Sequence, residues 1–185
     1  MKNLYSVIGL FVIFGLVAIA NVGCKKAAGG GWIPVYTDVE SGETSADMLG
    51  KATFGFNMKC IETDDGPLMK GQLQYNDHYN NVKFHGTLKI VTDELEEQIE
   101  AAQTCADIYA NYGDNRFLAI GSYTPQPKGK FDEEDRGIFY LYVVDNGEPG
   151  ASAGDEFDLV LLGGVYAPYS NFGYLGGGNI QVLED

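Results

Sequence analysis

The stretch KATFGFNMKC, residues 51–60, is the part of the sequence that decides the fold. Its apolar residues stand at every second position, from Ala52 through Phe54 and Phe56 to Met58. A period of two is typical of a β-strand that buries one face and turns the other to solvent. The stretch therefore predicts a half-buried strand, and it is the strongest strand signal in the chain.

The neighbouring segments repeat this alternation between turn signals. Asp64-Asp65-Gly66-Pro67 ends the strand, and GQLQYN at residues 71–76 returns the chain. Further strands are expected at 82–90, 107–111, 116–123, 137–145, 156–162 and 179–183. Eight or nine short strands separated by turns predict an all-β domain, either an antiparallel β-sandwich or a partly closed barrel.

One segment breaks this period. Asp93 and Glu96 form a capping box, and Leu95 and Ile99 recur at helical spacing. The pattern predicts one short inserted helix at residues 93–102, most simply a solvated cap over one end of the sheet.

The chain has 185 residues and is acidic, with 26 Asp and Glu against 12 Lys and Arg. Its formal net charge of −14 predicts a surface that repels phosphate backbones. No basic stripe interrupts it along the sequence, so nucleic acid is not an expected partner.

The N-terminus has the order of an export signal, with Lys2, an apolar run over residues 4–20 and then small residues. Val22-Gly23-Cys24 resembles the lipobox of bacterial lipoproteins, which predicts a signal peptide at 1–23 and a lipid on Cys24. Residues 24–31 would then be the lipidated Cys and a flexible tether, and 32–185 a single β domain. Two alternatives stay open: cleavage before Asn21 with plain secretion, and an uncleaved anchor at residues 4–23.

A lipid on Cys24 makes the membrane the first expected partner. In a host with an outer membrane, Lys25 is not a residue that retains a lipoprotein in the inner membrane. The expected location is therefore the outer membrane or the cell surface.

The three cysteines support this interpretation. If Cys24 carries lipid, Cys60 and Cys105 remain to pair in an oxidising compartment. A disulfide that closes about 45 residues would stabilise the fold by about 4 kcal/mol in the chain-entropy model. The alternative is two buried free thiols.

Signs of catalysis are weak. The chain has two histidines, His78 and His85, and no G-x-S-x-G or HExxH motif. With 26 acids, some pair will satisfy the spacing of glycosidase carboxylates by chance. No catalytic residue is predicted, and a non-catalytic module is favoured over an enzyme.

Two segments are candidates for binding. The loop after residue 144 carries Asp145, Asn146, Glu148 and Asp155, whose oxygens suit weak Ca²⁺ binding, although a structural turn is the simpler interpretation. No other cofactor is expected. The Gly-rich stretch VYAPYSNFGYLGGG carries four rings that would stack on sugars or contact an envelope protein, or pack over the core: Tyr166, Tyr169, Phe172 and Tyr174.

Five stretches taken together suggest a family: GKATFGFNMKC, KGQLQYNDH, VKFHGTL, VVDNGEPGASAGDEFDL and GGGNIQV. In this order they resemble exported bacterial proteins of the post-COAP domain group. The resemblance implies an all-β extracellular domain, often an accessory part of larger surface proteins, and it supplies no established activity. The sequence thus predicts a non-catalytic lipoprotein module of the cell envelope or surface, with a binding or structural role. The alternative is a small secreted hydrolase that acts on an envelope polymer or glycan through acidic residues.

Overall fold

The computed structural model describes residues 25–36, 48–63, 66–88 and 115–184. In these ranges nine antiparallel strands form one sheet, in the order β8-β7-β6-β5-β4-β3-β2-β1-β9. The strands are β1 (Lys25–Tyr36), β2 (Met48–Thr63), β3 (Gly66–Asp77), β4 (Val82–Thr87), β5 (Arg116–Pro125), β6 (Gly137–Val144), β7 (Glu156–Leu162), β8 (Tyr169–Tyr174) and β9 (Gly177–Glu184). Two short helical turns lie between strands, η1 (Glu133–Asp135) and α3 (Gly150–Ala153).

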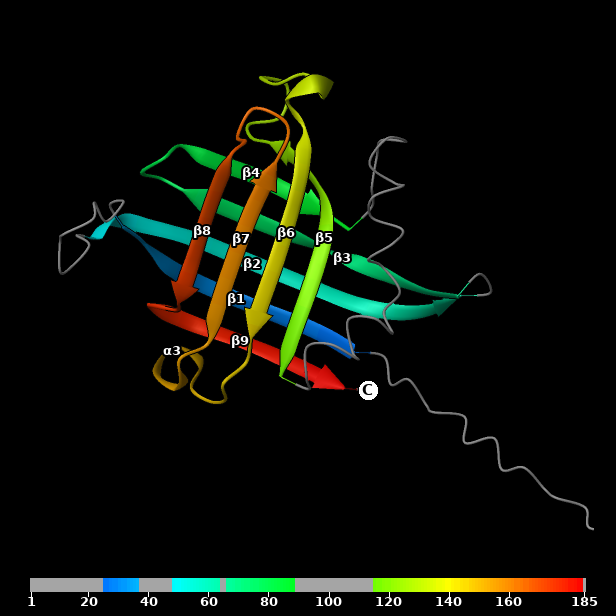
Figure 1. Ribbon diagram of the computed structural model, residues 1–185, viewed down its shortest axis with the longest axis vertical. Helices are drawn as coiled ribbons and strands as arrows, with labels where there is room; N and C mark the ends of the chain where they lie inside the picture. Colours follow the sequence, from blue (N-terminus) through cyan, green and yellow to red (C-terminus); the bar gives the residue numbers. More distant parts are fainter. Residues whose placement is uncertain (1–24, 37–47, 64–65, 89–114, 185) are drawn as a thin grey trace, which may run out of the picture.

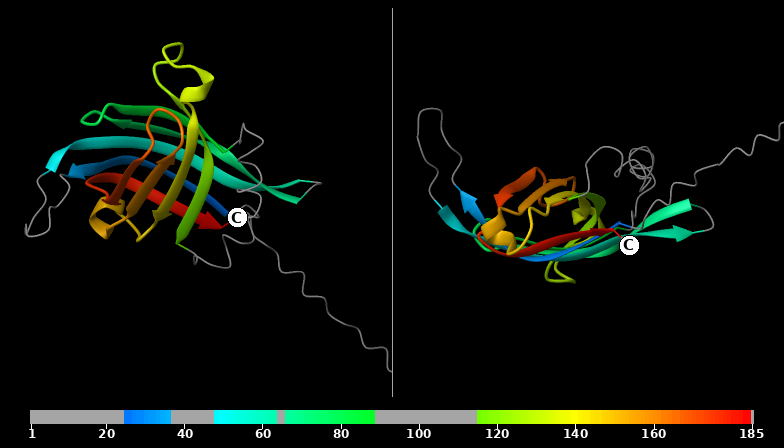
Figure 2. Two further views of the ribbon diagram at one scale, coloured as in Figure 1. Left: turned by 45° about the horizontal axis from the view of Figure 1, so that its top comes forward. Right: turned by 90° about the horizontal axis from the view of Figure 1, so that it is seen from below.

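The sheet curls over itself into two layers. Strands β5–β8 lie across β9-β1-β2-β3-β4 and cross them steeply (Figure 1). Seen from below, β5–β8 all lie on one side of the larger layer (Figure 2). This half-barrel confirms the predicted antiparallel sandwich or partly closed barrel of eight to nine strands, and it leaves β8 and β9 as the two edge strands.

The core fills the space between the layers. The inward residues predicted for β2, from Ala52 to Cys60, are all buried. The ring of Phe54 stacks on that of Phe157 with 3.9 Å between centroids, which joins β2 in one layer to β7 in the other. Every buried side-chain nitrogen or oxygen among the described residues has a hydrogen-bond partner.

The predicted tether is wrong. Residues 25–31 are the first half of β1, which pairs with β2 on one side and with β9 on the other. Small residues stand at the inward positions because there is no room for larger ones. A Cβ on Gly29 would lie 2.9 Å from both the carbonyl oxygen of Asn179 and the Phe56 ring. The β domain therefore begins at Lys25 rather than at Trp32.

The second difference is β8, which runs through the stretch that was expected to be a Gly-rich loop. It was missed because its inward positions are Tyr169, Asn171 and Gly173, which give no apolar alternation. The other strands expected within the described ranges are present, with ends that differ by a few residues. The strand expected at 107–111 and the helix expected at 93–102 lie outside the described residues.

Candidate functional site: a polar groove on the outer sheet face

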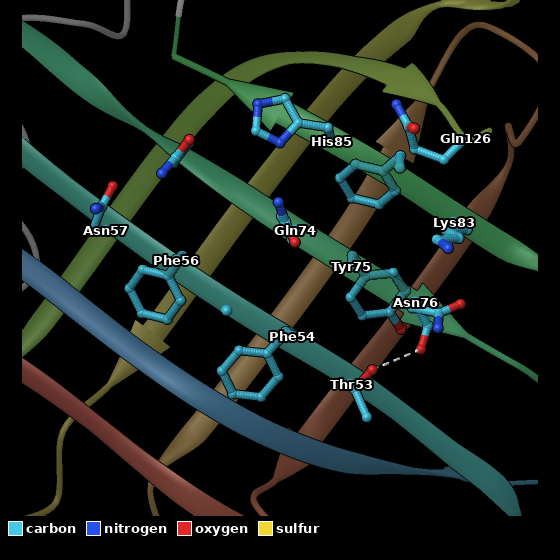
Figure 3. A pocket seen from close by; sticks show the side chains of 13 residues that line it. Thr53, Phe54, Phe56, Asn57, Gln74, Tyr75, Asn76, Lys83, His85 and Gln126 are labelled. Carbon is cyan, nitrogen blue, oxygen red and sulfur yellow. Dashed lines mark hydrogen bonds between the residues drawn. The ribbon is translucent and has the colours of Figure 1, made fainter. Parts of the chain in front are cut away.

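A hollow of about 800 Å³ lies on the face of β2, β3 and β4 that is turned away from β5–β8 (Figure 3). On each of these strands the polar residues of the hollow alternate with buried core residues. Five amides, two cationic or titratable groups and a hydroxyl line it: Asn57, Gln72, Gln74, Asn76, Gln126, Lys83, His85 and Thr53. The hollow is therefore a polar depression on the outside of the sheet.

Strand register brings these residues into rows. Gly55 on β2 is the partner of Gln74 on β3, which is the partner of His85 on β4. On one side of this row, Asn76 pairs with Lys83 across β3 and β4. Directly paired residues of an antiparallel sheet point to the same face, so the rows form one continuous surface.

Gly55 opens the middle of this surface. A Cβ at this position would meet nothing within 4 Å, so packing does not require glycine here. Glycine weakens a strand relative to residues with side chains. The glycine therefore leaves space in the hollow, and no close neighbouring atom requires it.

The lining suits a ligand that both donates and accepts hydrogen bonds. Each amide side chain carries a carbonyl oxygen and an NH₂ group in one plane. No Asp or Glu is among the residues that line the hollow. Hydroxyl-rich ligands such as sugars match this chemistry, because each hydroxyl is donor and acceptor at once.

A second hollow of about 350 Å³ adjoins the first on the same sheet. Asn57 lines both, and Lys26, Lys59 and Lys70 surround the second one. From Thr53 to Lys59 along β2 the two hollows span about 20 Å at the usual rise of a strand. We call the joined hollows the outer groove.

The acidic loop Asp145–Asp155 lies elsewhere, along the edge strand β9. Asp155 is fully buried, and its two oxygens accept hydrogen bonds from the backbone N–H groups of Asn146 and Ile180, each at 2.8 Å. Asp145 accepts from the N–H of Val182 at 2.9 Å. Ile180 and Val182 are the alternate donors that a tenth strand would have satisfied. The two carboxylates thus take the place of that strand.

Glu148 completes this loop. Its Oε1 accepts hydrogen bonds from the side-chain amides of Asn179 and Gln181, each at 2.8 Å. These bonds, first from Gln181 and then from Asn179, lower the pKa of Glu148 below its usual value. The loop is therefore held to β9 by three carboxylates.

The four calcium candidates do come together in this loop: Asp145, Asn146, Glu148 and Asp155. Their carboxylates are engaged by N–H groups, and the described residues contain no group of three or more His, Cys, Asp or Glu arranged to hold a metal ion. Calcium binding here stays a prediction.

The four aromatic candidates separate into two pairs. Tyr169 points into the core, where its hydroxyl lies 2.6 Å from that of Tyr75. Tyr166 stacks on Tyr123 with 5.9 Å between centroids. These two rings make structural contacts, which agrees with the alternative that the stretch packs over the core.

The other two rings, Phe172 and Tyr174, are 67% and 65% exposed on the outward face of β8. They lie beside β7, where burial raises the pKa of Asp158 above its usual value and the Gly173 backbone N–H partly offsets that rise. This outward face of β7 and β8 is thus distinct from the outer groove.

Of the three cysteines predicted to carry a lipid or form a disulfide, the structure describes one. Cys60 is buried on the inward face of β2, while Cys24 and Cys105 lie outside the described residues. Lipidation and a Cys60–Cys105 disulfide stay predictions. No helix in the described ranges is long and apolar enough to cross a membrane, and residues 4–23 are not among them.

No family model, curated protein or solved structure matches this chain. The resemblance to the post-COAP domain group therefore stays a prediction, and the geometry of the groove carries the functional argument.

Proposed function

We propose that this protein is a non-catalytic module of the cell envelope that binds a glycan in the outer groove. The observation that carries the proposal is the set of five amides that line an open hollow with Gly55 at its centre. In a typical binding pocket, a few convergent polar groups determine which ligand binds and in which orientation. Four amides on the paired strands β2 and β3, with Gln126 just after β5, supply such groups for a chain of sugars.

The proposal includes attachment to a membrane through a lipid on Cys24. Support comes from the lipobox-like residues 22–24 and from the start of the fold at Lys25. The anchor would then join the fold without a tether, and the outer groove would stay close to the envelope.

Glycan binding is tested with the full-length chain, purified in detergent, on an array of envelope polysaccharides. Gly55→Val adds a β-branched side chain to open space in a strand, so the fold should keep its stability while the groove is narrowed. We expect at least a tenfold loss of affinity. Ser170→Val, at an exposed position of β8, adds similar bulk on another face and should bind like the wild type. Unchanged binding by Gly55→Val, or no bound polysaccharide at all, would refute the proposal.

Attachment is tested separately. Cys24→Ala should release the protein from the membrane fraction, and labelled palmitate should mark only the wild-type chain. Unlabelled wild-type protein would leave secretion or an uncleaved anchor as the explanation.

One observation favours the alternative of a small hydrolase. The raised pKa of Asp158 suits a general acid, and Glu156 lies two residues away on the same face of β7. Their Cα atoms are about 7 Å apart at the usual rise of a strand, and a glycosidase uses two neighbouring carboxylates. Release of reducing sugar from a bound polysaccharide, abolished by Asp158→Asn, would establish the hydrolase. Binding without release would favour the module.

A further inference from the structure

We infer that the ligand of the outer groove is an acidic glycan, one that carries carboxylate or phosphate groups along its chain; this rests on the proposed glycan-binding function. The starting observation is the distribution of lysines. Five of the ten lysines in the sequence share the outward face of β1–β4: Lys26, Lys51, Lys59, Lys70 and Lys83. In a chain with a net charge of −14, this gathering is unexpected.

Three of these lysines form a row across neighbouring strands. Lys26 on β1 is paired with Lys59 on β2, and Lys59 is paired with Lys70 on β3. Directly opposed Cβ atoms in such a ladder are about 5 Å apart, and like charges placed there destabilise a sheet. A bound anion offsets the repulsion between Lys59 and Lys70, so this pair is well suited to a charged ligand.

The outer groove has lysines at both ends. Lys83 lines the hollow on β4, while Lys59 and Lys70 line the hollow toward β1. The amides of Gln72 and the other polar residues lie between them. A polymer that lies along the groove would meet hydrogen-bonding groups in the middle and positive charge at either end.

Acids are absent from the same surface. Among the outward residues of β9 and β1–β4 whose side chains the structure describes, none is Asp or Glu. One carboxylate, Glu148, reaches the β9 edge from its loop, where it is bonded to Asn179 and Gln181. The described outward side chains of these strands therefore carry positive charge, the sign opposite to the net charge of the whole chain.

The lining favours a glycan over two other polyanions. Single-stranded nucleic acid is held by exposed aromatic rings on which bases stack, and the rings that line the outer groove, Phe54, Phe56, Tyr75 and Phe84, are buried core residues. A membrane surface would meet lysines around a flat or apolar patch. Lys26, Lys59 and Lys70 do border a hollow with apolar lining, but Asn57 joins that hollow to the recessed one that the amides line. The hydroxyls of a sugar chain use the amides, and its acid groups use the lysines.

The test uses a matched pair of ligands. Polygalacturonate and its methyl ester have the same sugar backbone and differ in the charge of the carboxyl group. We expect the full-length chain in detergent to bind polygalacturonate at least tenfold more tightly than the ester, with an affinity that falls steeply as salt increases. Comparable binding of the two polymers would overturn the inference and leave glycan binding standing. Binding of neither would overturn the inference, and the polysaccharide array would then decide whether glycan binding itself stands.

Two double variants locate the charge. Lys59→Gln with Lys70→Gln should weaken polygalacturonate binding at least tenfold, flatten its salt dependence and leave binding of the ester unchanged. Lys128→Gln with Lys130→Gln removes the same charge from the loop after β5 and should bind like the wild type. Equal losses in the two variants would contradict a site in the groove. Equally tight, Lys59- and Lys70-dependent binding of single-stranded DNA or of anionic phospholipid vesicles would assign the groove to that partner instead.

Discussion

The hydroxyl oxygens of Tyr75 and Tyr169 lie 2.6 Å apart, and this contact joins β3 in one layer to β8 in the other. Tyr169 donates its proton to the buried carboxylate of Asp77 at 2.8 Å, while Asn171 donates to the Tyr75 oxygen at 2.9 Å. The proton between the two tyrosines therefore belongs to Tyr75. Burial is the main reason that the pKa of both tyrosines is raised well above its usual value, so both stay neutral.

Tyr169→Phe should destabilise the fold by about 2 kcal/mol, because it leaves the Tyr75 hydroxyl without an acceptor and removes one of the two hydrogen bonds that Asp77 Oδ2 accepts, the other coming from Asn80. Denaturant unfolding measures the change. Tyr174→Phe removes an exposed hydroxyl from the same strand and should cost less than about 0.5 kcal/mol. Equal costs for the two variants would show that the chain of hydroxyls contributes nothing.

Asp155→Asn should destabilise the fold by about 3 kcal/mol. The amide keeps one acceptor oxygen but turns an NH₂ group toward either Asn146 N–H or Ile180 N–H, both of which need an acceptor. Unfolding measurements and faster hydrogen exchange at the Ile180 amide report the loss. Glu134→Gln, at an exposed position, is the control and should change neither. A protected Ile180 amide in Asp155→Asn would refute the edge-capping role of Asp155.

The same loop allows a direct test of calcium. Asp145 and Asp155 each use both oxygens to accept backbone N–H groups. We therefore expect a melting temperature that does not respond to Ca²⁺ at about 1 mM, the range of weak extracellular sites. A rise that chelator reverses and that Asp145→Asn abolishes would instead establish a calcium site.

Asp158 should make stability depend on pH. Its pKa is raised in the folded state, so the folded protein binds the proton more tightly than the unfolded chain. Stability then falls as pH rises from the unfolded pKa, about 3.9, through the folded one. Asp158→Asn removes this cost and should raise stability by up to about 1 kcal/mol at pH 7, since the side chain is only half-buried, and by nothing near pH 3. A gain that is the same at both pH values would contradict the titration of Asp158.

The disulfide prediction can be tested in the exported protein. Unreduced peptide maps should contain linked Cys60 and Cys105, and Cys105→Ser should lower stability by about 4 kcal/mol if the link closes that loop. Cys24→Ser should leave the link intact. Two alkylatable thiols in the unreduced wild-type protein would rule the link out.

The sequence predicted elements whose inward residues are large and apolar. β2 was found from its alternating Phe54, Phe56 and Met58, and β7 was expected with the bounds it has. β1 was missed because its inward positions hold Gly29 and Gly31, which the close approach of neighbouring chain requires. Alternating small residues have the composition of a linker, and only the position of β9 reveals their role.

The outer groove was beyond the reach of sequence reasoning for a different reason. Lys26, Lys59 and Lys70 are far apart in the chain, and only strand register places them in one row. The expectation that no basic stripe interrupts the acidic surface was therefore incorrect. The alternation of residues 51–60 puts Lys59 on the face opposite the apolar residues, but nothing in the local pattern gives the alignment of one strand with the next.

The pairing of β1 with β9 also means that the sheet cannot be completed until β9 has been synthesised. Among the strands that the structure describes, β1 comes first in the chain and bonds along one side to β9 (Gly177–Glu184), which comes last, so this side of β1 stays unpaired until β9 has been made. Such an edge can pair with a strand of another chain and begin aggregation. Nascent chains that stall or are cut before residue 177 would carry this exposed edge permanently, so β9 is the strand that protects β1 from pairing with another chain.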